Sequence, residues 1–196
     1  LGTADDGGQI ALQPDGKIIV GGGFTNPRYK IVLQRLNANG SPDNGFGTSS
    51  VSRPHYFDSN NAGLVRISGI VLQADGKIVV STWSGNREKL SAAPFTGAGA
   101  LGSSFSSEGI AEFVIKTSNT KRPAKAQDLA LTTDGKVIVV GSILVGSKTD
   151  TVVAKPTRAG ALDPALGTAG VKTLDLAVNN NDAPESVRID STGKLV

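Results

Sequence analysis

Cysteine and methionine are absent from this sequence of 196 residues, and histidine and tryptophan each occur once. Without thiols the chain can form no disulfide and no thiolate-bound metal site. The absence of cysteine does not indicate whether the protein works in an oxidising or a reducing compartment. A histidine-ligated metal site needs more imidazoles than the single His55 supplies. The longest apolar run, around Ile18 to Phe24, is far too short to span a bilayer, so no membrane insertion is expected.

A strong excess of charge is also missing. The chain carries 20 lysines and arginines against 17 aspartates and glutamates, and its net charge of +3 is low for a nucleic-acid binder. We therefore predict no nucleic-acid partner. The densest basic cluster reads as a solvated loop, with an anionic glycan or phosphate contact as the alternative; it comprises Lys116, Lys121, Arg122 and Lys125.

What the sequence does contain is a repeat. The tripeptide Asp-Gly-Lys occurs at residues 15–17, 75–77 and 134–136, and a degenerate Thr-Gly-Lys copy follows at 192–194. The four glycines are 60, 59 and 58 residues apart, which is typical of a repeat architecture. Each copy lies between two short apolar runs. This predicts a β-hairpin with a two-residue Asp-Gly turn, because glycine takes positive φ freely and aspartate tolerates it.

The strands that return from these turns are apolar at successive positions, as in residues 17–20 and 77–80. This pattern is typical of strands covered on both faces, so we expect stacked sheets. The lysine that opens each returning strand recurs in phase. We interpret it as protection of a sheet edge against aggregation, with a basic track as the alternative.

A second glycine recurs in phase with the first, at Gly40, Gly99 and Gly160. Six residues beyond each lies a large apolar residue: Phe46, Phe105 and Leu166. Further strand candidates precede and follow this second landmark. Each unit therefore holds about four short strands and no amphipathic helical stretch.

These features predict an all-β fold, a β-propeller-like array of four-stranded antiparallel blades. Three units and a terminal hairpin would form an incomplete ring, because propellers typically have about four to eight blades. We assign residues 1–196 to a single repeat domain, with units at about 9–63, 64–124 and 125–184 and a partial unit at 185–196. The alternative is a β-solenoid, although its coils are usually shorter than about 30 residues.

At this level the chain resembles a known family, the delta-60 repeat of mostly secreted or surface-attached bacterial proteins. The resemblance lies in the first unit, in Leu12–Val20, Leu36–Asp43 and the Phe-Gly-Thr at 46–48, and extends as a weaker pattern over the chain. The second unit departs from it at residues 95–97 and 105–106, and the last turn has Thr192 in place of aspartate. The resemblance implies a propeller-like repeat, an extracellular or cell-surface location, and no established catalytic residues.

The two ends of the chain lead to a further expectation. The sequence begins at Leu1 without an initiator methionine and stops at Val196 inside a returning strand. Relative to the repeat, roughly a dozen residues, one outer strand, are missing before the first hairpin. We expect an open arc, completed by further sequence or by a second copy that associates through open blade edges.

Candidates for catalysis are few. His55 would have to serve any Ser-His-Asp arrangement, and no Gly-x-Ser-x-Gly motif supplies the serine. The turn aspartates Asp15, Asp75 and Asp134 are explained by the hairpins. The other carboxylates share no phase or spacing; they include Glu88, Glu108, Glu112, Asp150 and Glu185. We predict no catalytic residue and no enzyme activity, with a carboxylate pair at a propeller's central opening as the alternative.

Metal and ligand candidates are weak as well. The segments 58–61 and 179–182 are rich in asparagine and aspartate, which we interpret as turn chemistry in preference to a calcium site. We expect no metal and no cofactor. Trp83 is the one candidate for ligand binding, as a stacking platform for a sugar ring; its alternative role is packing.

The leading hypothesis is therefore a non-catalytic β-propeller module of a secreted or surface bacterial protein, acting in binding or scaffolding of an unknown protein or glycan. A carbohydrate-binding, lectin-like propeller or a carbohydrate-active one is the alternative. A third hypothesis makes the chain a structural repeat that spaces other domains.

Overall fold

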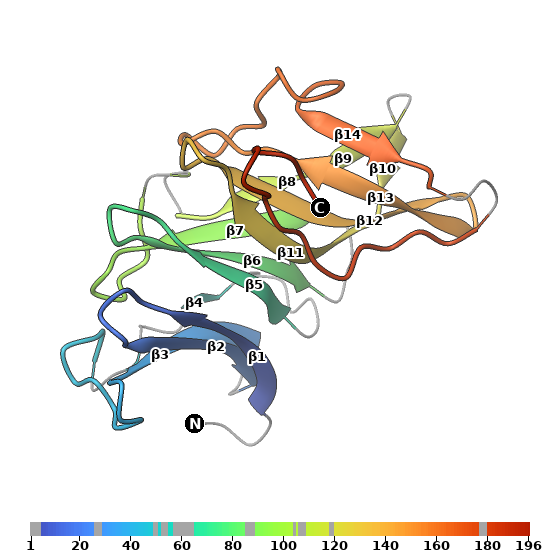
Figure 1. Cartoon of the computed structure of the whole chain (residues 1–196). Helices are drawn as coiled ribbons and strands as arrows, with labels where there is room; N and C mark the ends of the chain where they lie inside the picture. The colour runs from blue at the N-terminus through green and yellow to red at the C-terminus, as the bar shows by residue number, and fades with distance from the viewer. Residues whose placement is uncertain are drawn as a thin grey trace.

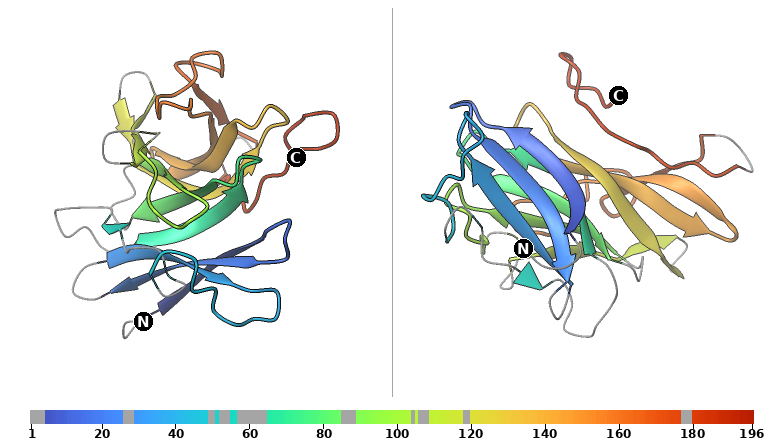
Figure 2. Two further views of the ribbon diagram at one scale, coloured as in Figure 1. Left: turned by 90° about the vertical axis from the view of Figure 1, so that its left-hand side faces the viewer. Right: turned by 90° about the horizontal axis from the view of Figure 1, so that it is seen from below.

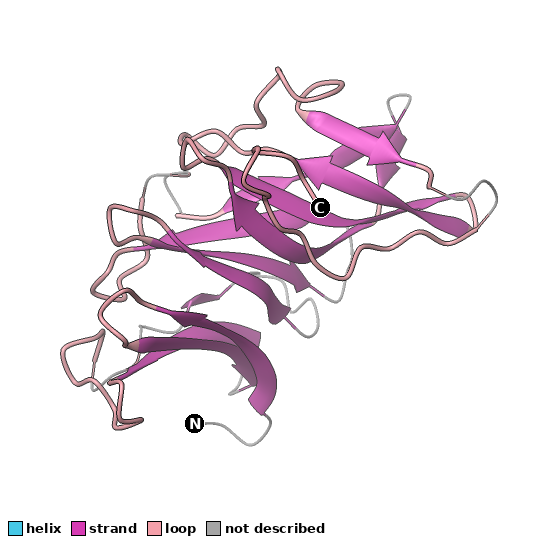
Figure 3. Ribbon diagram, in the orientation of Figure 1, coloured by secondary structure: helices cyan, strands magenta, loops and turns pink. Residues whose placement is uncertain are grey.

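The computed structural model describes residues 5–25, 29–48, 51, 55–56, 65–84, 89–103, 105, 109–117, 120–176 and 180–196. Among these residues every regular element is a β-strand (Figure 3). The described part accordingly holds no helix with the length and apolar character needed to cross a membrane.

Twelve of the strands form three sheets of four, each strand antiparallel to its neighbours in the sheet (Figure 1). The first sheet contains β1 (Asp5–Leu12), β2 (Ile18–Thr25), β3 (Tyr29–Leu36) and β4 (His55–Tyr56). The second contains β5 (Val65–Leu72), β6 (Ile78–Ser84), β7 (Leu90–Phe95) and β8 (Ala111–Phe113). The third contains β11 (Ala124–Leu131), β12 (Val137–Val145), β13 (Lys148–Ala154) and β14 (Val171–Leu174).

Strand order in each sheet follows the chain, so each is an up-and-down meander, the arrangement of a propeller blade. The predicted four-stranded antiparallel unit is thus confirmed. The link between the second and third sheets was expected to be a loop, and this expectation is wrong. It contains a two-stranded antiparallel ribbon of β9 (Ile115–Thr117) and β10 (Thr120–Arg122), in which Lys116 pairs with Lys121.

The three sheets stack face to face in chain order, as Figure 2 shows. Strand β5 lies against both β1 and β11, so the first strands of the sheets are neighbours at the inner side of the arc. The interior strand β6 explains the predicted run of successive apolar residues. Ile78 and Val80 join the core shared with the first sheet, whereas Val79 joins the core shared with the third. The second sheet therefore packs on both of its faces.

The fourth repeat contributes a hairpin, closed by the bridge between Ile189 and Leu195. Val187 of this hairpin packs against the outer face of the third sheet. At the other end of the stack, Ile10 and Leu12 are about 70% exposed, although the corresponding residues of the second sheet pack against the first. The structure is thus an incomplete β-propeller: three blades and a terminal hairpin in an open arc.

The turns differ from the expectation in one respect. In the first hairpin the amide of Gln13 donates to the carbonyl of Lys17 at 2.7 Å, and the amide of Gly16 donates to the carbonyl of Gln13 at 2.9 Å. The loop therefore has three residues, and only its glycine is left-handed, with φ of +82° at Gly16 and +81° at Gly76. The predicted two-residue turn is wrong because aspartate keeps ordinary angles and instead accepts from a nearby amide, as Asp75 does from Lys77 at 3.2 Å.

Candidate functional site

The Asp-Gly-Lys turns place charged pairs at one end of each sheet. Lys77 Nζ lies 2.6 Å from Asp75 Oδ2, and Lys136 Nζ lies 3.0 Å from Asp134 Oδ2. The hydrogen bond from Lys77 lowers the pKa of Asp75, and bonds from the Thr132 hydroxyl and then Lys136 lower the pKa of Asp134 to about 2. These lysines directly precede β6 and β12, which are interior strands, so their interpretation as guards of a sheet edge is wrong.

The junction between the first and second sheets is closed by Arg35. Its Nε donates to Asp43 Oδ2 at 2.7 Å, its Nη1 donates to the carbonyl of Gly97 at 2.7 Å, and its guanidinium carbon lies 4.8 Å from the centre of the Phe46 ring. Lys17 Nζ also lies 2.9 Å from Asp43. These contacts, first the bond from Lys17, lower the pKa of Asp43 to about 2. Arg35 thus ties one blade to the turn of the next.

The second unit lacks this arrangement. Strand register pairs Ile19 with Arg35 in the first sheet and Val79 with Pro94 in the second, so proline takes the place of the arginine. Gly102 takes the place of the partner aspartate. Its amide donates to the carbonyl of Pro94 at 2.8 Å, as the amide of Asp43 donates to the carbonyl of Arg35 in the first unit. The third unit restores a looser pair, in which Lys155 Nζ lies 3.6 Å from Asp163 Oδ2.

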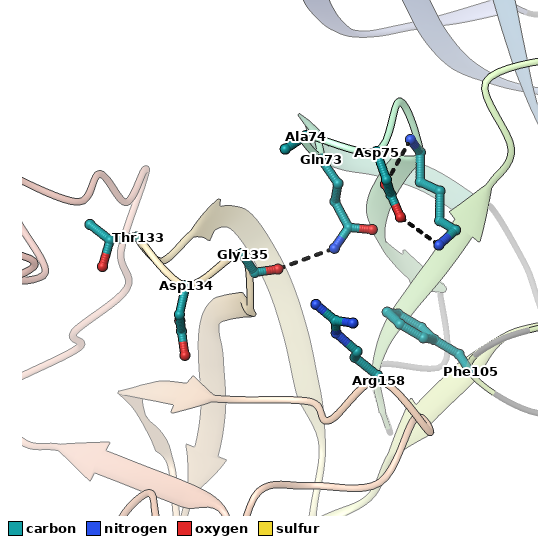
Figure 4. Close-up of a pocket in the computed structure, with 9 residues that line it drawn as sticks. Gln73, Ala74, Asp75, Phe105, Thr133, Asp134, Gly135 and Arg158 are labelled. Carbon is teal, nitrogen blue, oxygen red and sulfur yellow. Dashed lines mark hydrogen bonds and ion pairs between the residues drawn. The ribbon is translucent and has the colours of Figure 1, made fainter.

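A pocket of about 400 Å³ opens where the guanidinium would lie, at the junction of the second and third sheets. We call it the Arg158 pocket (Figure 4). Phe105, the equivalent of Phe46, is buried at its base, and the exposed Arg158 reaches in from the following unit. The Gln73 amide donates to the carbonyl of Gly135 at 3.1 Å and holds the two hairpins together. The remaining lining residues are Ala74, Asp75, Lys77, Thr133 and Asp134.

A second hollow, of about 350 Å³, lies where the inner strands meet, between residues 9–10, 70–71, 128–131 and 187–189. Its carboxylate is Asp128, which accepts from the amide of Val187 at 3.0 Å and from Arg188 at 2.9 Å. Asp128 therefore anchors the terminal hairpin. Its role was missed in the sequence. The available signal was a carboxylate at the position that Gly69 occupies in the second unit.

Trp83 lies on β6, half-buried, beside the third sheet. Lys125 Nζ is 4.7 Å from the centre of its ring, and the guanidinium carbon of Arg66 is 5.9 Å from it. Both distances are typical of cation–π contacts. A sugar stacked on Trp83 would have to share the ring with these cations. Lys125 therefore joins the second and third sheets. Two other lysines of the predicted basic cluster, Lys116 and Lys121, are exposed and pair across the β9–β10 ribbon.

The other sequence-derived candidates are scattered. His55 pairs through its backbone with Ile31, and its side chain lies outside the described part. Glu88, Glu108 and the segment 58–61 also lie outside it. Glu112 forms an ion pair with Lys89 at 2.5 Å in the second sheet, whereas Asp150 lies on β13 in the third.

In the described part of the second Asn/Asp segment, the side chains accept from backbone amides of preceding segments. Asn181 Oδ1 accepts from the amide of Thr149 at 3.0 Å, and Asp182 Oδ2 accepts from the amide of Leu176 at 2.7 Å. These bonds fix the segment against β13. Within the residues that the structure describes, no three histidine or carboxylate side chains gather as a metal would require.

Comparison with known proteins supports the propeller. Residues 13–46 and 132–165, corresponding parts of the first and third units, match a family model described as a β-propeller domain of unknown function, DUF5122. No curated protein sequence matches the chain. Among solved structures, an endo-arabinase from Bacteroides thetaiotaomicron is similar over 95% of this chain, with a TM-score of 0.51 and 11% sequence identity. The match spans 66% of that protein, just under two thirds, and identity this low establishes the fold alone.

Proposed function

We propose that this β-propeller array is a non-catalytic module for binding or scaffolding in a secreted or surface-attached bacterial protein. The observation that carries the proposal is the state of the carboxyl groups. Hydrogen bonds that stabilise the anion lower the pKa of four carboxyl groups, those of Asp43, Asp75, Asp134 and Asp190. Glycoside hydrolysis needs one carboxyl group with a raised pKa to donate a proton.

The polar side chains at the junctions support the same proposal. Arg35 joins the first blade to the second, Gln73 joins the second to the third, and Asp128 joins the third to the terminal hairpin. These polar groups are engaged in assembling the array. Such an array offers a broad, rigid surface, which suits recognition and spacing.

A polysaccharide panel tests the absence of catalysis. The whole chain is incubated with neutral and acidic polysaccharides, including arabinan, and reducing ends are measured alongside retention in affinity electrophoresis. We expect no new reducing ends with any substrate and retention by at least one polymer or by an immobilised surface protein. Turnover that disappears in Asp128→Asn and persists in Asp150→Asn would overturn the proposal.

The alternative is a carbohydrate-binding or carbohydrate-active propeller. The fold shared with an endo-arabinase and the hollow around Asp128 favour it. If this alternative holds through Trp83, binding of a glycan should be lost in Trp83→Ala. The arabinan assay above separates activity from binding, because a lectin-like module retains the polymer without cleaving it.

The location and self-association are also proposals. The resemblance to surface repeats supports an extracellular location. If the protein is exposed on the cell surface, protease added to intact bacteria that produce it should degrade it. Exposed Ile10 and Leu12 support association through the first sheet. Light scattering should show concentration-dependent dimers that disappear in Ile10→Ser/Leu12→Ser, and a monomer at all concentrations would contradict this.

A further inference from the structure

We infer that the Arg158 pocket binds a small carboxylate-bearing sugar, a uronic acid. This inference rests on the proposed binding function and adds to it a site and a class of ligand. Three observations carry it: the origin of the pocket, the balance of charge within it, and the groups that line it.

The pocket exists because one junction lacks a side chain that the other has. At the first junction Arg35 covers Phe46 and donates to the carbonyl of Gly97. At the second junction the equivalent residue is Pro94, whose side chain is too short and apolar to cross Phe105 in this way. The space that a guanidinium fills in one place is therefore open in the other.

Among the charged side chains that line the pocket, the guanidinium of Arg158 lacks a partner of opposite charge. Asp75 is paired with Lys77 at 2.6 Å and Asp134 with Lys136 at 3.0 Å, so both carboxylates have cationic partners. Arg158 has no hydrogen-bond or ion-pair partner among the described residues, and it stands where the second unit has Gly97. A planar guanidinium in this position matches the two oxygens of a carboxylate and binds them in parallel.

The remaining lining suits a polyhydroxylated ring. The oxygens of Asp75 and Asp134 and the hydroxyl of Thr133 can accept from or donate to sugar hydroxyls, and Phe105 supplies an apolar base. The bond from Gln73 to Gly135 connects the two walls, so the site is formed before a ligand arrives. A volume of about 400 Å³ lies within the range of small-ligand sites.

Isothermal titration of the whole chain with galacturonate, and with galactose as the neutral ligand of the same ring, tests the inference. We expect galacturonate to bind and galactose to bind at least about tenfold more weakly, because the carboxylate contact is lost. Arg158→Ala should weaken galacturonate about tenfold or more, with Arg158→Lys between it and the native chain. The matched control is Lys172→Ala, which removes an exposed cation of β14 that does not line the pocket.

A second variant tests the origin of the pocket. Pro94→Arg with Gly102→Asp rebuilds the first junction at the second, so the pocket should close and galacturonate binding should disappear while the melting temperature is kept. Galacturonate binding that is unchanged in Arg158→Ala would overturn the inference. Retention of some other polymer with no galacturonate binding would also overturn it and leave the proposed function standing, whereas no binding to any probe would remove both.

Discussion

The first and second junctions of this stack are built from the same repeat, but a side chain fills the first, whereas the second is open. At the first, Arg35 lies over Phe46 and bonds to the neighbouring turn; at the second, Pro94 leaves the space over Phe105 open. The sheets on either side have the same strand order, and both junctions bury a continuous apolar core. A repeat array can therefore gain a site through a few side chains at one junction, without a change of fold.

The largest expected effect comes from Gly160, at the second junction. Gly160 and Gly76 both have positive φ, +78° and +81°, but a Cβ on Gly160 would lie 1.7 Å from the carbonyl oxygen of Phe105, whereas one on Gly76 would contact nothing within 4 Å. Gly76→Ala should lower the free energy of unfolding by about 1–2 kcal/mol through strain alone. Gly160→Ala should lower it by about 3–4 kcal/mol, since backbone must also move. Equal denaturation midpoints would show that the contact is unimportant.

Removing the arginine should make the first junction resemble the second. Arg35→Ala loses the bond to Gly97 and the contact with Phe46, and we expect the free energy of unfolding to fall by about 2 kcal/mol. The matched change in the third unit is Lys155→Ala, whose ion pair is longer and should contribute less than about 1 kcal/mol. Urea denaturation of both variants measures the difference. A larger effect for Lys155 would contradict our account of the first junction.

The third junction gives a local effect. Asp128→Asn removes the negative charge of the group that accepts hydrogen bonds from Val187 and Arg188, so both bonds weaken. The terminal hairpin should then open more often while the sheets stay folded. Hydrogen exchange should show roughly tenfold faster exchange for the amides around residue 188 and unchanged exchange in β6. Uniform acceleration throughout the chain would mean that the hairpin and the sheets unfold together.

The smallest effect is the dependence on pH. The pKa of Asp43 and that of Asp134 are both about 2, below their unfolded value of about 3.9. Because the folded pKa is the lower one, the stabilisation is complete above the unfolded pKa and is lost as pH falls through the folded pKa. Thermal melts should be constant from about pH 7 to 5 and fall between about pH 4 and 2. In Asp43→Asn the melting temperature should fall less steeply between these pH values. An unchanged profile would mean that other carboxyl groups cause the fall.

The sequence predicted the sheets well because their signals are local. Glycines at fixed spacing between apolar runs mark each hairpin, and the runs at residues 77–80 correctly indicated strands covered on both faces. The turn length was wrong because Asp-Gly is compatible with two loops, and the choice depends on which residues close the pair. The ribbon at β9–β10 carries no turn signal comparable to the others.

The sites could not be predicted to the same extent, for a physical reason. Whether Arg35 fills a junction depends on its cross-strand register and on the neighbouring unit's turn, which is 62 residues away at Gly97. Asp128 likewise acquires its role from Arg188, 60 residues on. Such pairs follow from aligning the repeats position by position and not only by their turns. The neighbours of Trp83, Arg66 and Lys125, come from two other strands, so its surroundings could not be predicted from its being the single tryptophan.

The division of β6, with Val79 facing one neighbour and Ile78 and Val80 facing the other, has a consequence for how such chains can evolve. A gene segment of about 60 codons encodes a layer with two compatible sides, so its duplication inserts a layer that fits between its own parent and the next. The new copy begins as redundant architecture, and substitutions at interlayer positions, as at Pro94 and Gly102, open a space at one junction while the layers stay stacked.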